Sequence, residues 1–221
     1  MKKLIGPFSQ ILTMENLPLS GSLSDDQLKI IRNGGVIIDG EKIIKTGHFN
    51  DLRKEVSDII EISSSKVLLP GFIDSHTHIC YSGDRSSEFS KRNSGVPYQK
   101  ILEEGGGIHN TMKATAEATD DELVNSTLSR LDRHFSEGVT TCEIKSGYGS
   151  SIENELRLLR IINKIKKIHH SDVIPTCLAA HVKPMDFESN EVYLDSIIDD
   201  VIPILRLSLI HISEPTRPSS I

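Results

Sequence analysis

From Val67 onward, apolar stretches of strand length alternate with longer stretches of helical periodicity. Strands are expected at Val67–Ile73, Val139–Ile144 and Val173–Ala180. Parallel strands need long connections, so alternation at this spacing predicts a parallel sheet with helical crossovers. The expected helices cover residues 97–118 with an interruption at Gly105–Gly107, residues 119–138, residues 150–168 and residues 190–204. Thr119 and Ser150 each precede a Glu by three residues, a capping box that marks a helix start.

Residues 1–66 have a different texture, with short apolar runs separated by turn signals. Val36–Gly47 predicts a β-hairpin, because Asp39-Gly40 between two apolar runs is a strong turn signal. A short helix is expected at Leu52–Val56. These features predict a small β module that precedes the alternating region.

Polar residues follow each expected strand of the alternating region. They are His76 and His78 after the first strand, Glu143, Lys145 and Tyr148 at the second, and His181 after the third. Functional residues at the carboxyl ends of several strands are typical of a (β/α)₈ barrel, although a doubly wound sheet also presents its strand ends. No Gly-x-Gly-x-x-Gly follows the first strand, which disfavours a dinucleotide fold. A barrel needs about 250 residues, so only about half of the strands are expected here.

The segment Pro70–His78 carries two histidines one residue apart. Side chains alternate along a strand, so His76 and His78 point the same way and can bind one metal ion at about 2.1 Å per nitrogen. Neutral imidazole suits zinc, iron and nickel, so the spacing does not choose the metal. Two solvated histidines in a loop would give the same string. Asp74 is expected to orient a histidine ligand or the strand end.

Composition excludes several classes of partner. The chain of 221 residues has a formal net charge of −6, so no basic field attracts nucleic acid or an anionic membrane. No apolar run approaches the roughly 18 residues of a membrane span, and the start lacks the apolar core of a signal peptide. The three cysteines are widely spaced, which favours reduced thiols in a cytoplasm over a disulfide framework.

The sequence changes character after Leu205. Residues from about 206 resemble the translated read-through of a sequencing-library adaptor, and the alternative is a natural polar terminus. Residues 206–221 are therefore expected to be a non-native tail, and His211 is assigned no chemistry.

Several motifs together resemble a known family. Leu69–His78 is similar to the first-strand motif of the amidohydrolase superfamily. Within it, the chain resembles the imidazolonepropionases from near the N-terminus to about Leu205. The segments that carry this resemblance are Gly83-Asp84-Arg85 with Glu88-Phe89, Gly105–Ile108, Glu143–Gly149 and Leu178–His181.

The resemblance implies a fold and an activity. Residues 67–205 would form the first half of an amidohydrolase-type (β/α)₈ barrel, preceded by part of a β-sandwich in residues 1–66. The family hydrolyses the cyclic amide 4-imidazolone-5-propanoate to N-formimidoyl-L-glutamate in histidine degradation. It uses one zinc or iron ion. A homodimer in the cytoplasm is also implied.

The resemblance also implies roles for residues. His76 and His78 would be metal ligands, while Arg85, Tyr148 and His181 would hold the substrate. A further His and an Asp ligand, and a Glu that transfers protons, are expected on later strands that this sequence lacks. The catalytic acid and base are therefore not assigned.

The chemistry of these residue types fits those roles. A guanidinium fork at Arg85 matches the carboxylate of the propionate, unless it is solvated or paired with Asp84 or Glu88. Tyr148 lies between two glycines, which let the backbone turn sharply. His181 could donate a hydrogen bond or help to protonate the departing nitrogen. Lys145 is expected to pair with Glu143.

Three alternatives remain open at this stage. The parent protein could be another cyclic-amide hydrolase or an aminohydrolase of the same superfamily. It could also be a metal-free scaffold with an amidohydrolase-like fold. The chain as it stands could be an incomplete barrel without activity, since open sheet edges promote aggregation.

Overall fold

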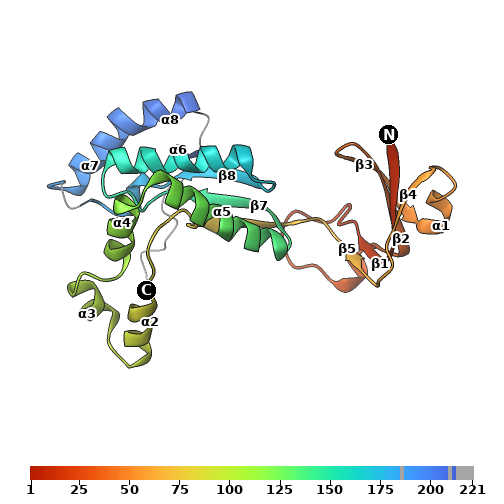
Figure 1. The fold of residues 1–221 in the computed structure, drawn as a ribbon, viewed down its shortest axis with the longest axis horizontal. Coiled ribbons are helices and arrows are strands. Elements are labelled where there is room, and N and C mark those ends of the chain that lie inside the picture. Colours follow the sequence, from red (N-terminus) through yellow and green to blue (C-terminus); the bar gives the residue numbers. More distant parts are fainter. Residues whose placement is uncertain (185–186, 209–210, 213–221) are drawn as a thin grey trace. The chain divides into compact units, whose positions relative to one another are not determined.

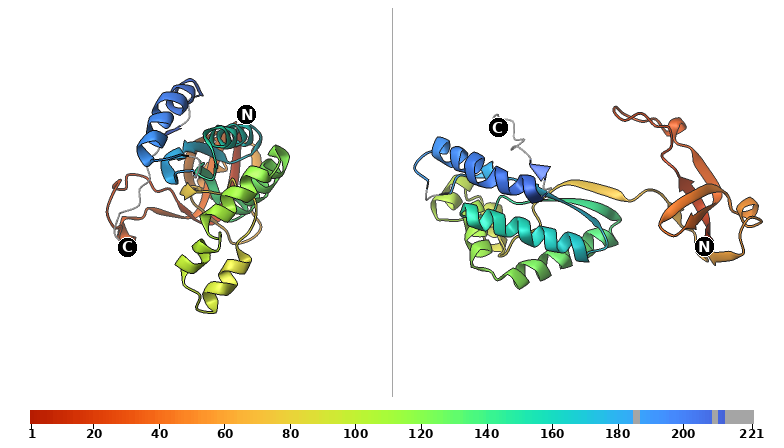
Figure 2. Two further views of the ribbon diagram at one scale, coloured as in Figure 1. Left: turned by 90° about the vertical axis from the view of Figure 1, so that its left-hand side faces the viewer. Right: turned by 90° about the horizontal axis from the view of Figure 1, so that it is seen from above.

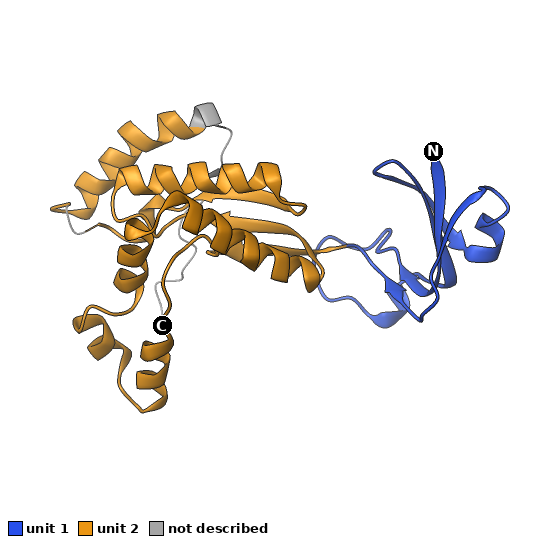
Figure 3. Ribbon diagram, in the orientation of Figure 1, with its two compact units in different colours: residues 1–70 blue, residues 71–221 orange. Residues whose placement is uncertain are grey.

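The computed structural model describes residues 1–184, 187–208 and 211–212. The chain divides into two compact units, Met1–Pro70 and Gly71–Ile221 (Figure 3). Within the described residues, no helix is long and apolar enough to cross a lipid bilayer.

The first unit is built on a five-stranded sheet (Figure 1). Its long central strand β1 pairs antiparallel with β2 and parallel with β4 and β5. The predicted hairpin is confirmed, because β2 and β3 are antiparallel and Gly40 between them has a φ of +60°. The elements are β1 (Lys2–Leu12), η1 (Asp25–Gln27), β2 (Ile30–Asp39), β3 (Lys42–His48), α1 (Phe49–Leu52), β4 (Asp58–Glu61) and β5 (Val67–Leu68).

A small apolar core supports this sheet. Leu4 and Ile37 from the sheet pack against Phe49 and Leu52 of α1. The short helix therefore begins and ends earlier than the predicted Leu52–Val56, because Phe49 and Leu52 are the side chains that the sheet buries. The described strands of the first unit form one sheet, so they do not include the second layer of a β-sandwich.

The prediction of one strand over Val67–Ile73 is wrong, because this segment contributes to two separate strands. Val67–Leu68 adds to β1 as β5, and a new strand, β6 (Phe72–Thr77), starts in the second unit. Between them, Gly71 packs so closely on Thr140 that a Cβ atom would collide with that side chain. The unit boundary accordingly falls after Pro70 and not after residue 66.

The second unit is an α/β layer structure. Its sheet has the order β6-β7-β8-β9, and every neighbouring pair is parallel. The pairs β6-β7 and β7-β8 are parallel as the alternation predicted, whereas β9 lies in residues for which no strand was predicted. Helices α5 and α6 lie side by side against this sheet (Figures 1 and 2). The helices before β7 are α2 (Ser86–Asn93), α3 (Tyr98–Glu103), α4 (Ile108–Glu117) and α5 (Asp120–Ser136). The later elements are β7 (Val139–Lys145), α6 (Ile152–Ile168), β8 (Asp172–Cys177), η2 (Ala179–His181), α7 (Asn190–Ser196), η3 (Ile197–Val201), α8 (Ile202–Ser208) and β9 (His211–Ile212).

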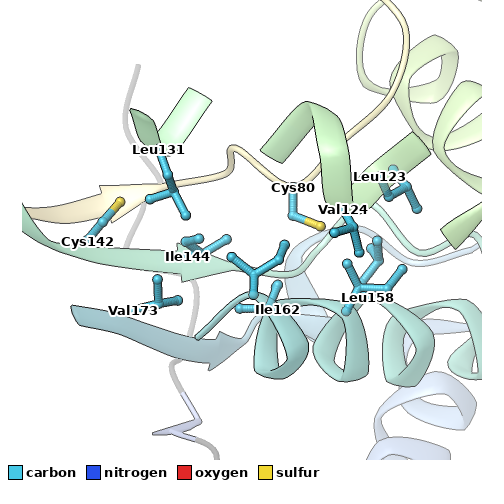
Figure 4. Packing of buried hydrophobic residues seen from close by; sticks show 11 residues of the cluster. Cys80, Leu123, Val124, Leu131, Cys142, Ile144, Leu158, Ile162 and Val173 are labelled. Atoms are coloured by element: carbon cyan, nitrogen blue, oxygen red, sulfur yellow. The ribbon is translucent and has the colours of Figure 1, made fainter. Parts of the chain in front are cut away.

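The main core lies between the sheet and the two helices. Figure 4 shows Leu131 of α5 and Ile162 of α6 facing Cys142 and Ile144 of β7 and Val173 of β8. All five are at most 1% exposed. Close packing of this cluster fixes the register of helices on strands, and thereby the places where the strand ends emerge.

Two local predictions need correction. The cap of α6 is Ser151, whose side chain accepts a hydrogen bond from the Asn154 amide, and not a capping box that opens at Ser150. Strand β8 ends at Cys177, because the chain then turns through the single 3₁₀ turn η2. The capping box at Thr119 is confirmed.

The proposed tail is only partly described. Arg206–Ser208 continues α8, and His211–Ile212 pairs with Thr176–Cys177 of β8. Residues 209–210 and 213–221 lie outside the described residues.

Candidate functional site

His76 and His78 lie at the carboxyl end of β6. Their ring centroids are 5.7 Å apart. Thr77 between them is buried, and its hydroxyl donates to the carbonyl of Glu143 on β7. The Asp74 carboxylate accepts from the His76 amide at 3.2 Å, so Asp74 shapes the strand end as predicted. Alternation along β6 thus turns Thr77 into the protein and leaves the two imidazoles on the other side.

His78 is the best-enclosed imidazole of the pair. Its ring centroid lies 5.3 Å from that of His181 and 5.6 Å from that of Tyr148. Burial, and then the nearby charges of His181 and His76, lower the pKa of His78 to about 4. At neutral pH its imidazole is therefore uncharged, which is the form that binds metal ions.

The Nδ1 atom of His78 is buried and has no hydrogen-bond partner among the described residues. A buried polar atom without a partner is unfavourable by about 1–3 kcal/mol, so such atoms call for an explanation. A neutral imidazole beside a second one fits a bound cation. In the described part of the chain, however, no group of three or more His, Cys, Asp or Glu side chains could hold a metal ion.

Tyr148 is held in the loop that follows β7. Gly147 before it has a φ of +109°, a conformation that side chains with a Cβ rarely adopt. Burial raises the pKa of the Tyr148 phenol, and the Arg85 guanidinium lowers it in part, which places that charge near the phenol. The structure thus brings Tyr148 and His78 together, as the strand-end pattern predicted.

Arg85 is the N-cap residue of α2, and its Nε donates to Thr111 Oγ1 at 2.9 Å. The two acids close to Arg85 in the sequence have other hydrogen-bond partners. Asp84 accepts from the Ser86 amide at 2.9 Å, and Glu88 accepts from the Gly107 amide at 3.0 Å. Among the described residues no ion pair involves Arg85, so its charge is available for a ligand.

Glu143 and Lys145 form the predicted pair, with Oε2 and Nζ 2.7 Å apart. Burial raises the pKa of Glu143, but hydrogen bonds from Lys145 and Thr176 more than offset it, and the net pKa is lowered. The Lys145 side chain is only 7% exposed. The pair, together with the bond from Thr176 to Glu143, holds the end of β7 against β8.

Comparison with known proteins identifies the relatives. No protein-family model matches the chain. Imidazolonepropionase of Clostridium tetani is 38% identical over 211 residues, covering 92% of this chain and 50% of that protein. Imidazolonepropionase of Parabacteroides distasonis is 39% identical over 209 residues, covering 93% and 50%. This chain is a homologue of the imidazolonepropionases.

The chain spans about half the length of the imidazolonepropionases that it matches. Among solved structures, guanine deaminase from C. acetobutylicum with bound guanine has a TM-score of 0.51 at 10% identity, covering 98% of this chain and 46% of that one. This likeness shows that the chain has a mixed α/β fold, as that protein does. The imidazolonepropionase resemblance expected from the motifs is confirmed.

Two residues that hold the candidate site of this chain were not predicted from the sequence. Glu155 accepts hydrogen bonds from the loop that carries Tyr148. Arg130 donates from Nη1 to the carbonyls of Ile79 and Tyr81, at 2.7 and 2.8 Å, and so fixes the chain after the two histidines. A signal for Glu155 existed, because it shares helical spacing with the inward-facing Leu158 and Ile162.

Proposed function

We propose that this chain forms part of the active site of an imidazolonepropionase-type hydrolase. The reaction opens the cyclic amide 4-imidazolone-5-propanoate with water and gives N-formimidoyl-L-glutamate. The observation that carries the proposal is the cluster at the strand ends, where the His78 ring lies 5.3 Å from His181 and 5.6 Å from Tyr148. The identity of 36 to 40% with imidazolonepropionases supports the choice of substrate.

His76 and His78 would hold one zinc or iron ion. When bound, such an ion acts as a Lewis acid and lowers the pKa of water at the site toward about 7. The imidazole of His78 is neutral and half-buried, and its Nδ1 has no hydrogen-bond partner in the part of the chain that the structure describes, which supports this assignment. A further His, an Asp ligand and a Glu for proton transfer complete the proposed site.

Arg85 would bind the propionate of the substrate. Because its Nε already donates to Thr111, the two Nη groups are left to form parallel hydrogen bonds with a carboxylate. The Tyr148 phenol, near the Arg85 charge, would then lie beside the ring of the bound substrate.

His181 would hold the substrate ring from the end of β8. Its ring centroid is 5.3 Å from that of His78, close enough for one small ligand to contact both. A hydrogen bond from His181 to the substrate is the simplest role. The same group could help to protonate the nitrogen that departs when the ring opens.

We further propose that residues from Gly71 to about 205 form the first half of a (β/α)₈ barrel. Strands β6, β7 and β8 would be the first strands of that barrel. The parallel order of these strands and the clustering of polar residues at their carboxyl ends support it. The first unit would contribute to a β-sandwich, and residues 206–221 would be non-native.

A hybrid protein tests the activity. Residues 1–205 would be joined to the part of Clostridium tetani imidazolonepropionase that lies beyond the matched half, and loaded with zinc or iron. We expect turnover of 4-imidazolone-5-propanoate and not of hydantoin, dihydroorotate or guanine, with loss of turnover on His78→Ala. Preference for another substrate in this panel, or a folded, metal-loaded hybrid without activity, would contradict the proposal.

A further inference from the structure

Glu155 is an acidic side chain at a core position. It lies in the first turns of α6, on the face that also carries Leu158 and Ile162, and it is 1% exposed. A carboxylate taken out of water is strongly unfavourable unless hydrogen bonds replace its hydration. The partners of Glu155 therefore show what this position does.

Those partners are backbone amides on both sides of Tyr148. Oε1 of Glu155 accepts from the Gly147 amide at 3.0 Å and from the Gly149 amide at 2.7 Å, and Oε2 accepts from the Gly147 amide at 3.1 Å. Burial raises the pKa of Glu155, and the nearby Ser146 hydroxyl lowers it in part. One buried group thus binds the loop before and after the phenol-bearing residue.

The glycines of this loop match the carboxylate in space. A Cβ atom on Gly149 would lie 2.6 Å from both Cγ and the backbone nitrogen of Glu155. Gly147 has the positive φ that turns its amide toward the same carboxylate. The Gly-Tyr-Gly sequence and Glu155 therefore form one structural unit, although they belong to a loop and a helix.

Helix capping and ion pairing are the two ordinary roles of a buried acid, and neither accounts for Glu155. The N-terminus of α6 is already capped by Ser151, which accepts from the Asn154 amide at 3.2 Å. The buried cation nearby, Lys145, is paired with Glu143 at 2.7 Å. Helix capping and ion pairing therefore leave its burial unexplained.

Ser146 extends the connection to the next strand end. Its hydroxyl oxygen accepts from the Leu178 amide at 3.0 Å, three residues before His181. The Glu155–Ser146 contact thus connects the Tyr148 loop with the turn that presents His181.

Resting on the proposed function, we propose that Glu155 is a positioning residue that sets Tyr148 against His78 for substrate binding. It acts through its hydrogen bonds to the Gly147 and Gly149 amides. Without it, the loop would lose the acceptors that hold its shape.

The test uses Glu155→Gln in the 221-residue chain, with Glu153→Gln, an exposed acid on the same helix, as the matched control. Glutamine keeps the size but replaces one acceptor oxygen with an amide nitrogen that can only donate. We expect hydrogen exchange at the Gly147 and Gly149 amides to quicken at least about tenfold. In protein labelled with 3-fluorotyrosine, the ¹⁹F signal of Tyr148, assigned with Tyr148→Phe, should shift. The signal of Tyr98 on α3 should stay. Tyr81 lies beside Tyr148 and Tyr193 lies near Glu155, so their signals are not used as references. Glu153→Gln should change neither the exchange nor the Tyr148 signal.

Several outcomes would overturn the proposal. Unprotected Gly147 and Gly149 amides in the unsubstituted chain would do so, as would an unmoved Tyr148 signal in Glu155→Gln. An equal shift of the Tyr98 signal would overturn it too, because the effect would then be a general loss of structure. If Glu155→Gln does not fold, protection in the unsubstituted chain and Gly149→Ala, which pushes directly on Glu155, decide instead.

Turnover separates this inference from the proposed function. In the active hybrid, Glu155→Gln should raise KM as Tyr148→Phe does, and add nothing in the Tyr148→Phe background. An additive effect would overturn the positioning role. A hybrid without turnover whose Tyr148 signal still responds to Glu155→Gln would contradict the proposed hydrolase alone.

Discussion

At the residue scale, His78 combines three properties that rarely coincide in a structural histidine. It is uncharged because it is half-buried near His76 and His181, its Nδ1 lacks a partner among the described residues, and its neighbours are polar rings. Buried histidines with purely structural roles satisfy their nitrogens with hydrogen bonds. The combination favours a ligand-binding role over a packing role.

The lowered pKa of His78 predicts that acid destabilises the fold. The folded pKa is about 4, against 6.5 for the free side chain, so the unfolded chain binds more protons between these values. The free energy of unfolding should therefore fall as the pH drops from about 7 to about 4, by about 1–2 kcal/mol after allowance for solvent screening. Urea titrations at both ends of this range measure it. His78→Gln should reduce the pH dependence, whereas His109→Gln, an exposed control, should not; equal slopes in the two variants would contradict the prediction.

Arg85→Lys tests the guanidinium fork. Lysine keeps the charge but loses the Nε bond to Thr111 and the paired Nη donors. In the hybrid protein we expect KM for 4-imidazolone-5-propanoate to rise about 10- to 100-fold, with kcat less affected, because a charged hydrogen-bonded pair is lost from binding. Arg92→Lys on the exposed side of α2 is the control, and equal KM values in both variants would exclude Arg85 from substrate binding.

At the scale of the element, α6 joins the core to the site. In its first turn, Glu155 accepts hydrogen bonds from the loop after β7. In its middle, Leu158 and Ile162 are buried against the sheet. Ile168 at its end is 55% exposed. The core and the Tyr148 loop are thus held in fixed relative positions, because side chains of the same rigid helix contact both.

Two truncations on α6 should separate core from surface. Ile162→Ala removes a side chain that is 0% exposed and should lower the free energy of unfolding by about 2–5 kcal/mol, through lost burial and the cavity left behind. Ile168→Ala should cost well under about 1 kcal/mol. Chemical denaturation followed by circular dichroism measures both. A similar loss for the two variants would mean that the α6 face is assigned wrongly.

At the scale of the whole molecule, each unit has its own apolar cluster, and the candidate site belongs to the second unit alone. The three free cysteines, all buried, also lie there. Burial raises the pKa of Cys80 to about 11, and it raises the pKa of Cys142 and Cys177 as well. The thiols are therefore reporters of the integrity of this unit.

Thiol labelling should follow unfolding. The native chain should react slowly with a disulfide reagent at about pH 8, because burial hides the sulfur atoms and disfavours the reactive thiolate. In denaturant, three equivalents should react at once. Rapid labelling of the native chain would show that the cluster around Cys80 and Cys142 is open.

The local elements could be predicted because their signals are local. Thr119 begins α5 through side-chain contacts to its own helix, and Asp39-Gly40 makes the hairpin turn wherever the chain lies. The grouping of His76, Tyr148 and His181 was also foreseeable, since parallel strands bring their carboxyl ends to one edge. The division of Val67–Ile73 was not, because pairing of Val67 with β1 depends on a strand far away in sequence.

By itself, the sequence determined the order of strands and helices between residues 97 and 204, the His pair, and the resemblance to the imidazolonepropionases. Periodicity, caps and short motifs are properties of neighbouring residues, which is why they can be read without the structure. Only the tertiary structure decided that Glu155 binds the Tyr148 loop and that, among the described residues, Arg85 is held by Thr111 and by no acid. These contacts join separate elements. Their energies depend on burial and distance, which packing alone creates.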